Sequence, residues 1–189
     1  MMNKLMIPAV FLICTLLCSC TSVTCKQPVG EKPVALDKAK WNGSWTSADG
    51  DVFYTRVKDS STGLLELVSV SVEDSEIRVE KAVVQIRQSA DWLWVSMKGE
   101  NDENFSFGRV TEPGHEIIYW IPKAAPFAER VRNGELPGVL IKESDGQEKG
   151  GVILNALATE HLKAIEAGKW GEVFDWSQPV VLRRLKSGK

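Results

Sequence analysis

The segment Leu64-Leu65-Glu66-Leu67-Val68-Ser69-Val70-Ser71-Val72 decides the fold class. Its second half alternates valine with serine, and this period of two is the pattern of a strand that buries one face. From Trp41 onward, similar short apolar runs are separated by turn residues about every eight to twelve positions. The links between the runs are short and polar, which favours antiparallel neighbours. The sequence therefore predicts a mainly β protein, with an antiparallel barrel or half-barrel.

We expect about nine strands, which is a count read from the pattern of apolar runs. Two short helices interrupt the series. The first, at 126–133, is followed by Gly134 as a stop, and the second, at 159–167, can be capped by Thr159. Between the helices a hairpin is expected around Asp145-Gly146, and a last strand is expected at 180–185.

The start of the chain is typical of a secretory signal. Lys4 carries one positive charge, and residues 5–17 form an uncharged apolar run. This run is too short to cross a bilayer core, which needs about 20 residues. A charged start, a short apolar stretch and the small residue Ser19 are the parts of a cleavable export signal.

The segment Leu17-Cys18-Ser19-Cys20 resembles the box at which bacterial lipoprotein precursors are cut. Cys18 departs from the pattern, because such signals more often carry Ala, Ser or Thr there. The resemblance implies that the mature protein begins at Cys20 with palmitate-type acyl chains attached, and that its partner is a membrane. Thr21, where inner-membrane lipoproteins carry Asp, implies the outer membrane of a bacterial envelope, facing the periplasm. An ordinary secretory signal or an uncleaved anchor stays open as an alternative.

The chain then divides into three parts. Residues 1–19 are the expected signal peptide, and residues 20–38 are expected to be a flexible tether, because Pro28, Gly30 and Pro33 stand among polar residues without an apolar period. Residues 39–189 are expected to form one β-rich domain. This domain contains no cysteine, so neither a disulfide nor a cysteine zinc site is expected in it.

Gly43-Ser44-Trp45 on the first expected strand resembles the Gly-x-Trp that opens lipocalin-like barrels. In that family a late arginine packs across the indole, which implies Arg183 or Arg184 as the partner of Trp45 in a plug at one end of the barrel. The second lipocalin signature, centred on Thr-Asp-Tyr, is absent, and the helix at 126–133 is additional. The sequence is also similar to small uncharacterised bacterial lipoproteins in which a Gly-x-Trp strand opens a β-domain.

The sequence contains no catalytic, cofactor or metal motif. His115 lies in an expected turn and His161 in the first turn of the second helix, too far apart in the sequence to indicate a triad or a metal site. The acidic stretch at 101–104 lacks the spaced ligands of a calcium loop. We therefore expect no catalytic residue, no cofactor and no metal.

The aromatic residues are the better functional clue. Trp92 and Trp94 share one strand face, Phe105 and Phe107 share another, and Trp120 lies on the following strand. Core packing accounts for them, but a barrel interior lined by these residues could also hold a small apolar ligand.

The leading hypothesis is a membrane-anchored, non-enzymatic binding module. Its ligand would be a small hydrophobic molecule or a partner protein of the envelope. An envelope assembly factor that acts through protein contacts, and an enzyme of unknown type, remain alternatives. The formal net charge of −2 gives no reason to expect nucleic acid as a partner. The sequence leaves the oligomeric state open.

Overall fold

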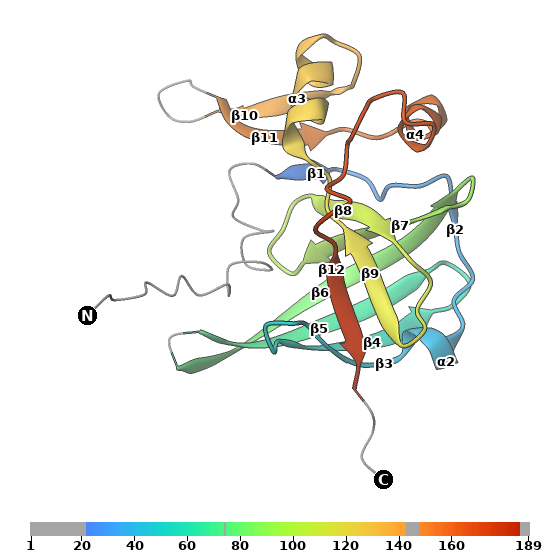
Figure 1. Ribbon diagram of the computed structural model, residues 1–189, viewed down its shortest axis with the longest axis vertical. Helices are drawn as coiled ribbons and strands as arrows, with labels where there is room; N and C mark the ends of the chain where they lie inside the picture. The colour runs from blue at the N-terminus through green and yellow to red at the C-terminus, as the bar shows by residue number, and fades with distance from the viewer. Residues whose placement is uncertain (1–21, 74, 143–147, 186–189) are drawn as a thin grey trace.

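A computed structural model describes residues 22–73, 75–142 and 148–185 (Figure 1). The expected signal peptide and the expected lipid-attachment residue Cys20 lie outside the described residues. Among the residues that the structure describes, no helix is both long enough and apolar enough to cross a membrane.

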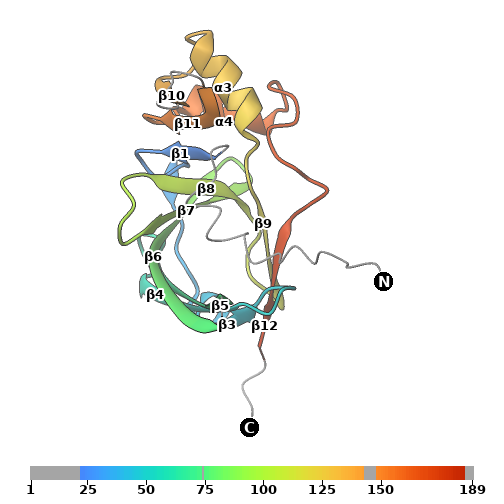
Figure 2. The same ribbon diagram turned by 90° about the vertical axis from the view of Figure 1, so that its left-hand side faces the viewer.

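Eight strands form a closed antiparallel barrel, seen end-on in Figure 2. Neighbouring strands pair in chain order, and the last strand closes the ring by pairing with both the first and the seventh. The barrel predicted from the sequence is thereby confirmed. Its strands are β3 (Gly43–Thr46), β4 (Val52–Asp59), β5 (Leu64–Glu73), β6 (Glu76–Ser89), β7 (Trp92–Gly99), β8 (Phe105–Val110), β9 (Glu116–Trp120) and β12 (Val180–Arg184).

Further elements extend the sheet outside the barrel. β1 (Val23–Cys25) pairs antiparallel with β8 and parallel with β11 (Glu148–Leu154), which carries β10 (Gly138–Lys142) on its other edge. β2 (Lys32–Pro33) pairs with β6. The two expected helices are present as α3 (Ala124–Arg132) and α4 (Thr159–Glu166), and a third short helix, α2 (Lys38–Trp41), precedes the barrel.

The segment expected to be a tether is part of the folded body. Its apolar residues Val23, Cys25, Val29 and Leu36 are buried, and the backbone N–H of Val29 donates to Ser96 Oγ at 2.9 Å. From Ser22 onward this segment is therefore not a spacer. Gly30 has a positive φ of 115°, and Pro33 belongs to β2, where it pairs with Arg87.

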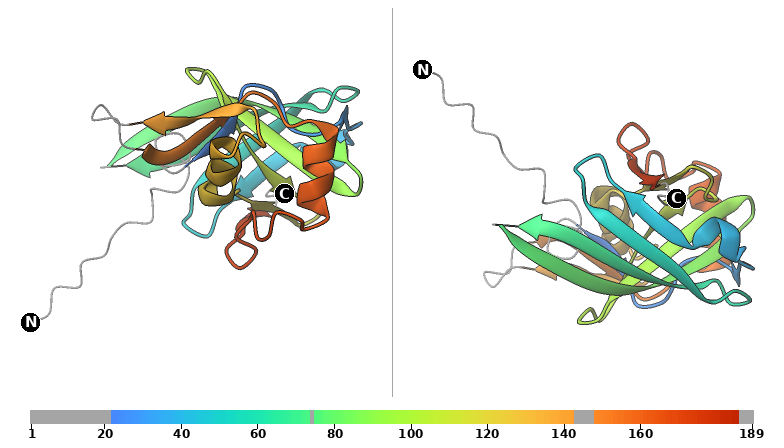
Figure 3. Two further views of the ribbon diagram at one scale, coloured as in Figure 1. Left: turned by 90° about the horizontal axis from the view of Figure 1, so that it is seen from above. Right: turned by 90° about the horizontal axis from the view of Figure 1, so that it is seen from below.

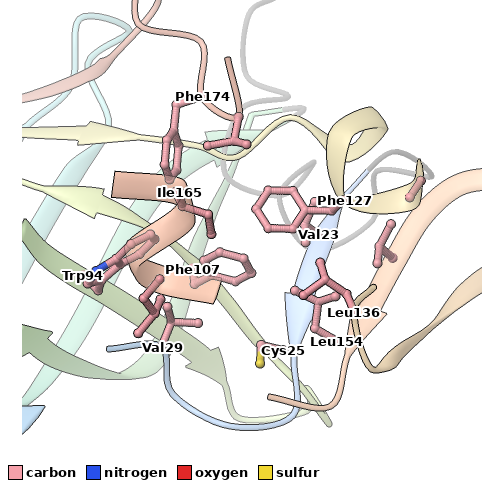
Figure 4. Packing of buried hydrophobic residues seen from close by; sticks show 14 residues of the cluster. Val23, Cys25, Val29, Trp94, Phe107, Phe127, Leu136, Leu154, Ile165 and Phe174 are labelled. Atoms are coloured by element: carbon pink, nitrogen blue, oxygen red, sulfur yellow. The ribbon is translucent and has the colours of Figure 1, made fainter. Parts of the chain in front are cut away.

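Two hydrophobic cores lie on opposite faces of β7 and β8. Alternate residues of β7 point into the barrel, as Val95 does, or out of it, as Trp94 does. The inner core fills the barrel and consists of Leu36, Trp41, Trp45, Phe53, Val57, Leu65, Val84, Ile86, Val95, Val110, Ile117 and Tyr119. The outer core lies between the barrel wall, β1, β11, α3 and α4 (Figure 4) and consists of Val23, Cys25, Val29, Trp94, Phe107, Phe127, Ala128, Leu136, Val152, Leu154, Leu162, Ile165, Val173 and Phe174.

The β5–β6 hairpin projects beyond one end of the barrel, at the lower left of Figure 1. The alternation at 68–72 does form a strand with one buried face, but the valines are not on that face. Leu65 points into the inner core, so the valines of opposite parity lie on the outer face, where Val70 and Val72 are exposed.

Candidate binding site inside the barrel

The barrel interior holds an apolar pocket with a volume of about 110 Å³. Its wall presents only apolar surface, because the hydroxyl groups of the lining residues Thr55 and Tyr119 point to protein groups instead of into the pocket. For comparison, an apolar protein cavity of about 150 Å³ admits benzene or xenon. The pocket therefore suits a small apolar molecule or the apolar end of a longer one. Its lining residues are Trp41, Phe53, Thr55, Leu65, Leu67, Val84, Ile86, Val95, Met97, Val110, Ile117, Tyr119, Val180 and Leu182.

The partly exposed lining residues indicate where the pocket opens. Four lining residues are only half-buried, namely Leu67, Met97, Val180 and Leu182. Met97, near the end of β7, and Val180, the first residue of β12, lie at the barrel end from which the β5–β6 hairpin projects. The opposite end is covered by α2, which contributes the buried Trp41, and by the preceding segment with Leu36 (Figure 1).

Trp45 and Arg184 form the plug at the covered end. The guanidinium carbon of Arg184 lies 4.2 Å from the centroid of the Trp45 ring, and its nitrogens donate to the carbonyls of Asn42, at 3.0 Å, and Lys40. Trp45 is fully buried and donates its indole N–H to Thr55 Oγ1 at 2.9 Å. The structure thus brings together Trp45 and Arg184, while Arg183 points outward.

Arg183 has a different contact because side chains alternate along β12. Its Nε donates to Glu116 Oε1 at 3.1 Å, and three quarters of its side chain is exposed. Of the two arginines named from the sequence, Arg184 is therefore the one that contacts the indole.

Tyr119 enters the pocket because Gly108 faces it across the sheet. A Cβ atom at Gly108 would lie 2.3 Å from the Tyr119 ring, so no larger residue fits there with the ring in place. The Tyr119 hydroxyl is buried and donates a long hydrogen bond of 3.5 Å to the Phe107 carbonyl. Burial raises the pKa of Tyr119 above its usual value, so the phenol stays neutral.

The five aromatic residues named as cavity lining do not line the barrel pocket. Trp94 and Phe107 belong to the outer core, against which Trp92 and Trp120 pack from its edge. Phe105 lies on the outer surface, with the Lys98 ammonium 5.5 Å from its ring centroid. The interior is lined instead by aliphatic residues, Phe53, Trp41 and Tyr119.

Three of the tryptophans enclose an arginine outside the barrel. The guanidinium of Arg109 lies 4.4 Å from the Trp92 ring centroid and 5.3 Å from those of Trp120 and Trp176. Burial lowers the pKa of Arg109 from its usual value. Because the guanidinium already occupies the aromatic faces, this cluster is a packed structural element at the edge of the outer core.

The two histidines considered as candidate site residues have structural roles. His161 Nδ1 accepts the backbone N–H of Ala158 at 3.1 Å, so His161 rather than Thr159 satisfies the start of α4. His115 lies in the turn before β9, far from His161, and its carbonyl accepts the N–H of Arg184. Across the described residues, no group of three or more metal-ligating side chains occurs.

Comparisons with known proteins identify no relative: no family model, no curated protein and no solved structure matches this chain.

Proposed function

We propose that this protein is a lipid-anchored protein of the bacterial cell envelope that binds a small apolar molecule inside its barrel and catalyses no reaction. The observation that carries the binding proposal is the apolar pocket in the barrel interior. Burial of apolar ligand surface there is favoured by about 25 cal/mol per Å². The pocket wall presents no polar surface, so shape and size set the preference among ligands.

The anchoring part of the proposal is supported by the N-terminal sequence. The box Leu17-Cys18-Ser19-Cys20 follows a charged start and a short apolar run. One acyl chain holds a protein weakly on a membrane, and two or more hold it stably. The Gly-x-Trp resemblance and the pairing of Trp45 with Arg184 favour a lipocalin-like barrel, and a site within the barrel suits the proposed ligand.

The binding proposal is tested by thermal unfolding in the presence of benzene and, separately, of octanoate. A ligand that binds only the folded state raises the unfolding temperature by mass action. Trp41 lines the pocket, so a change in tryptophan emission should accompany the shift. Two variants locate the site. Val84→Phe fills the pocket, whereas Val83→Phe places the same ring on the outer surface, where Val83 is half exposed.

We expect Val84→Phe to fold with a loss of about 1–3 kcal/mol in unfolding free energy and to show no ligand-induced shift. Val83→Phe should respond as the unsubstituted protein does. A ligand response that survives in Val84→Phe, or the lack of any response in the unsubstituted protein, would contradict binding inside the barrel.

The anchor is tested by growing bacteria that produce the full chain with a clickable fatty acid. We expect acyl label on the unsubstituted protein and its loss in Cys20→Ala. Equal label in both proteins, or none in either, would refute lipid attachment at Cys20.

A further inference from the structure

The β5–β6 hairpin has an apolar outer face that no other part of the described chain covers. Its cross-strand pairs are Val70 with Val79 and Val72 with Ile77, and the exposed fractions of Val72 and Ile77 are 62% and 74%. Four large aliphatic side chains in one contiguous exposed patch are unusual on a soluble surface.

The opposite face of the hairpin is polar. Ser69 and Ser71 alternate with the valines of β5, and they pair with Glu80 and Arg78 across the hairpin. The hairpin is therefore amphipathic over the length that projects beyond the barrel. A polar inner face and an apolar outer face fit an element that lies at a boundary between water and a less polar phase.

The proposed anchor places a membrane close to the start of β1, at the end of the barrel from which the hairpin projects. The Ser22 carbonyl is fixed by a 2.8 Å hydrogen bond from the Val152 N–H. Cys20 is two residues earlier, and two residues reach at most about 7 Å. β1 begins toward the end of the barrel from which the hairpin projects (Figure 1), whereas Figure 2 shows β1 beside β8, across the barrel from β5. Without a spacer, the folded body must lie against the bilayer that holds the acyl chains.

The base of the hairpin carries a charge pattern suited to lipid headgroups. A shallow outer groove of about 420 Å³ is lined by Lys58, Lys81 and Lys98, with Glu66 and Glu100 also in its wall. Lys58 lies 3.7 Å from Glu66. Lys81 follows Ile77 and Val79 on the same face of β6, so a lysine borders the apolar patch at its base, whereas the strands end at the cross-strand pair of Glu73 and Glu76 at the tip.

We propose that the outer face of the β5–β6 hairpin enters the headgroup and upper acyl region of the membrane, with Lys81 and Lys98 near lipid phosphates. This inference rests on the lipid anchor proposed above. Apolar side chains bordered by lysines are the features by which a surface element binds a bilayer that contains anionic lipid.

The test uses the full chain, produced with its lipid in bacteria and reconstituted into vesicles of phosphatidylethanolamine with a minority of phosphatidylglycerol. Ile77→Cys is labelled with a polarity-sensitive nitrobenzoxadiazole dye. The matched control, Ala39→Cys, places the same dye on an exposed position of α2 at the far end of the barrel. Cys25 is fully buried and should remain unlabelled, which the unsubstituted protein checks.

We expect the Ile77→Cys dye to shift to shorter wavelength on vesicles and to be quenched several-fold more by nitroxide lipids than the Ala39→Cys dye. Equal exposure of both dyes to aqueous iodide, on protein that floats with the vesicles, would overturn the inference while leaving the anchor intact. The companion variant Cys20→Ser should not float with the vesicles. If it floats as well as the acylated protein, the anchor itself fails, and the inference that rests on it fails too.

Discussion

Arg184 is the residue whose contacts close the covered end of the barrel. It stacks on the Trp45 indole at 4.2 Å and donates to two carbonyls of the chain entering β3. The contact joins the first strand of the barrel, β3, to the last, β12. These two strands pair at two register positions, Thr46 with Arg183 and Trp45 with Arg184. Lysine cannot reproduce a planar stack combined with several fixed donors.

Arg184→Lys should therefore lower the free energy of unfolding by about 1–3 kcal/mol, the cost of a lost cation–π contact and a carbonyl left without its donor. Arg183→Lys is the matched control on the same strand, and its exposed ion pair predicts a change of about 0–1 kcal/mol. Urea unfolding measures both. Equal losses in the two variants would contradict the role assigned to Arg184.

The reactivity of the Cys25 thiol tests whether its segment is folded or is a free tether. Its side chain is fully buried, and burial raises the pKa of the thiol. The thiolate is the reactive form, so the folded protein should react with a disulfide reagent at least a hundredfold more slowly than the urea-unfolded protein. The measurement uses protein that begins at residue 20 with Cys20 replaced by Ser. Rapid reaction of the folded protein would show that this segment is a free tether.

At the scale of elements, α4 places the Glu166 carboxyl group against the outer core. Trp94 donates its indole N–H to Glu166 Oε1 at 3.3 Å. The pKa of Glu166 is raised, chiefly because burial disfavours the charged form, and the Glu31 and Asp91 carboxylates add to this. The folded state therefore binds a proton at a higher pH than the unfolded chain does. Stability should fall as the pH rises between the unfolded and folded pKa values.

Glu166→Gln removes this penalty while keeping an oxygen that can accept from Trp94. We expect the variant to be more stable than the unsubstituted protein near neutral pH, and the difference to vanish below about pH 4, where the carboxyl is protonated in both states. Urea unfolding at the two pH values measures this. A difference of the same size at both would contradict the assigned cause.

The strands themselves are predictable from the sequence, but the direction that each face points is not. Period two identifies β5 correctly, yet Leu65 inside and Val72 outside have opposite parity, and both are apolar. The same ambiguity applies to β7, where Trp94 on one face and Val95 on the other are both buried. Sequence periodicity shows that residues alternate between two faces of a strand. It shows which face is buried only when the other face is polar.

The shortest elements cannot be predicted from the sequence, for a related reason. β1 has three residues and β2 has two, too few to show a period. Their placement depends on partners distant in the chain, such as Val152 beside Val23. By contrast, a local three-residue pattern was sufficient to identify Trp45 as the indole that faces a late arginine.

At the scale of the whole molecule, three features gather at one end. The pocket opens at the barrel end marked by Met97 and Val180, the β5–β6 hairpin projects from that end, and β1 starts toward the same side (Figures 1 and 3). In the lipid-anchored form that we propose, this arrangement would turn the pocket toward the membrane, which is a source of apolar molecules. The outer core, with α3 and α4, covers a different part of the barrel wall.

Methyl-labelled nuclear magnetic resonance during a benzene titration tests the central claim most directly. We predict saturable shifts at Leu65, Val84, Met97 and Ile117, which line the pocket, and unchanged positions for Leu162 and Ile165 in the outer core. Saturable shifts centred on the outer core, or no shift at any methyl group up to the solubility limit of benzene, would contradict a binding site inside the barrel.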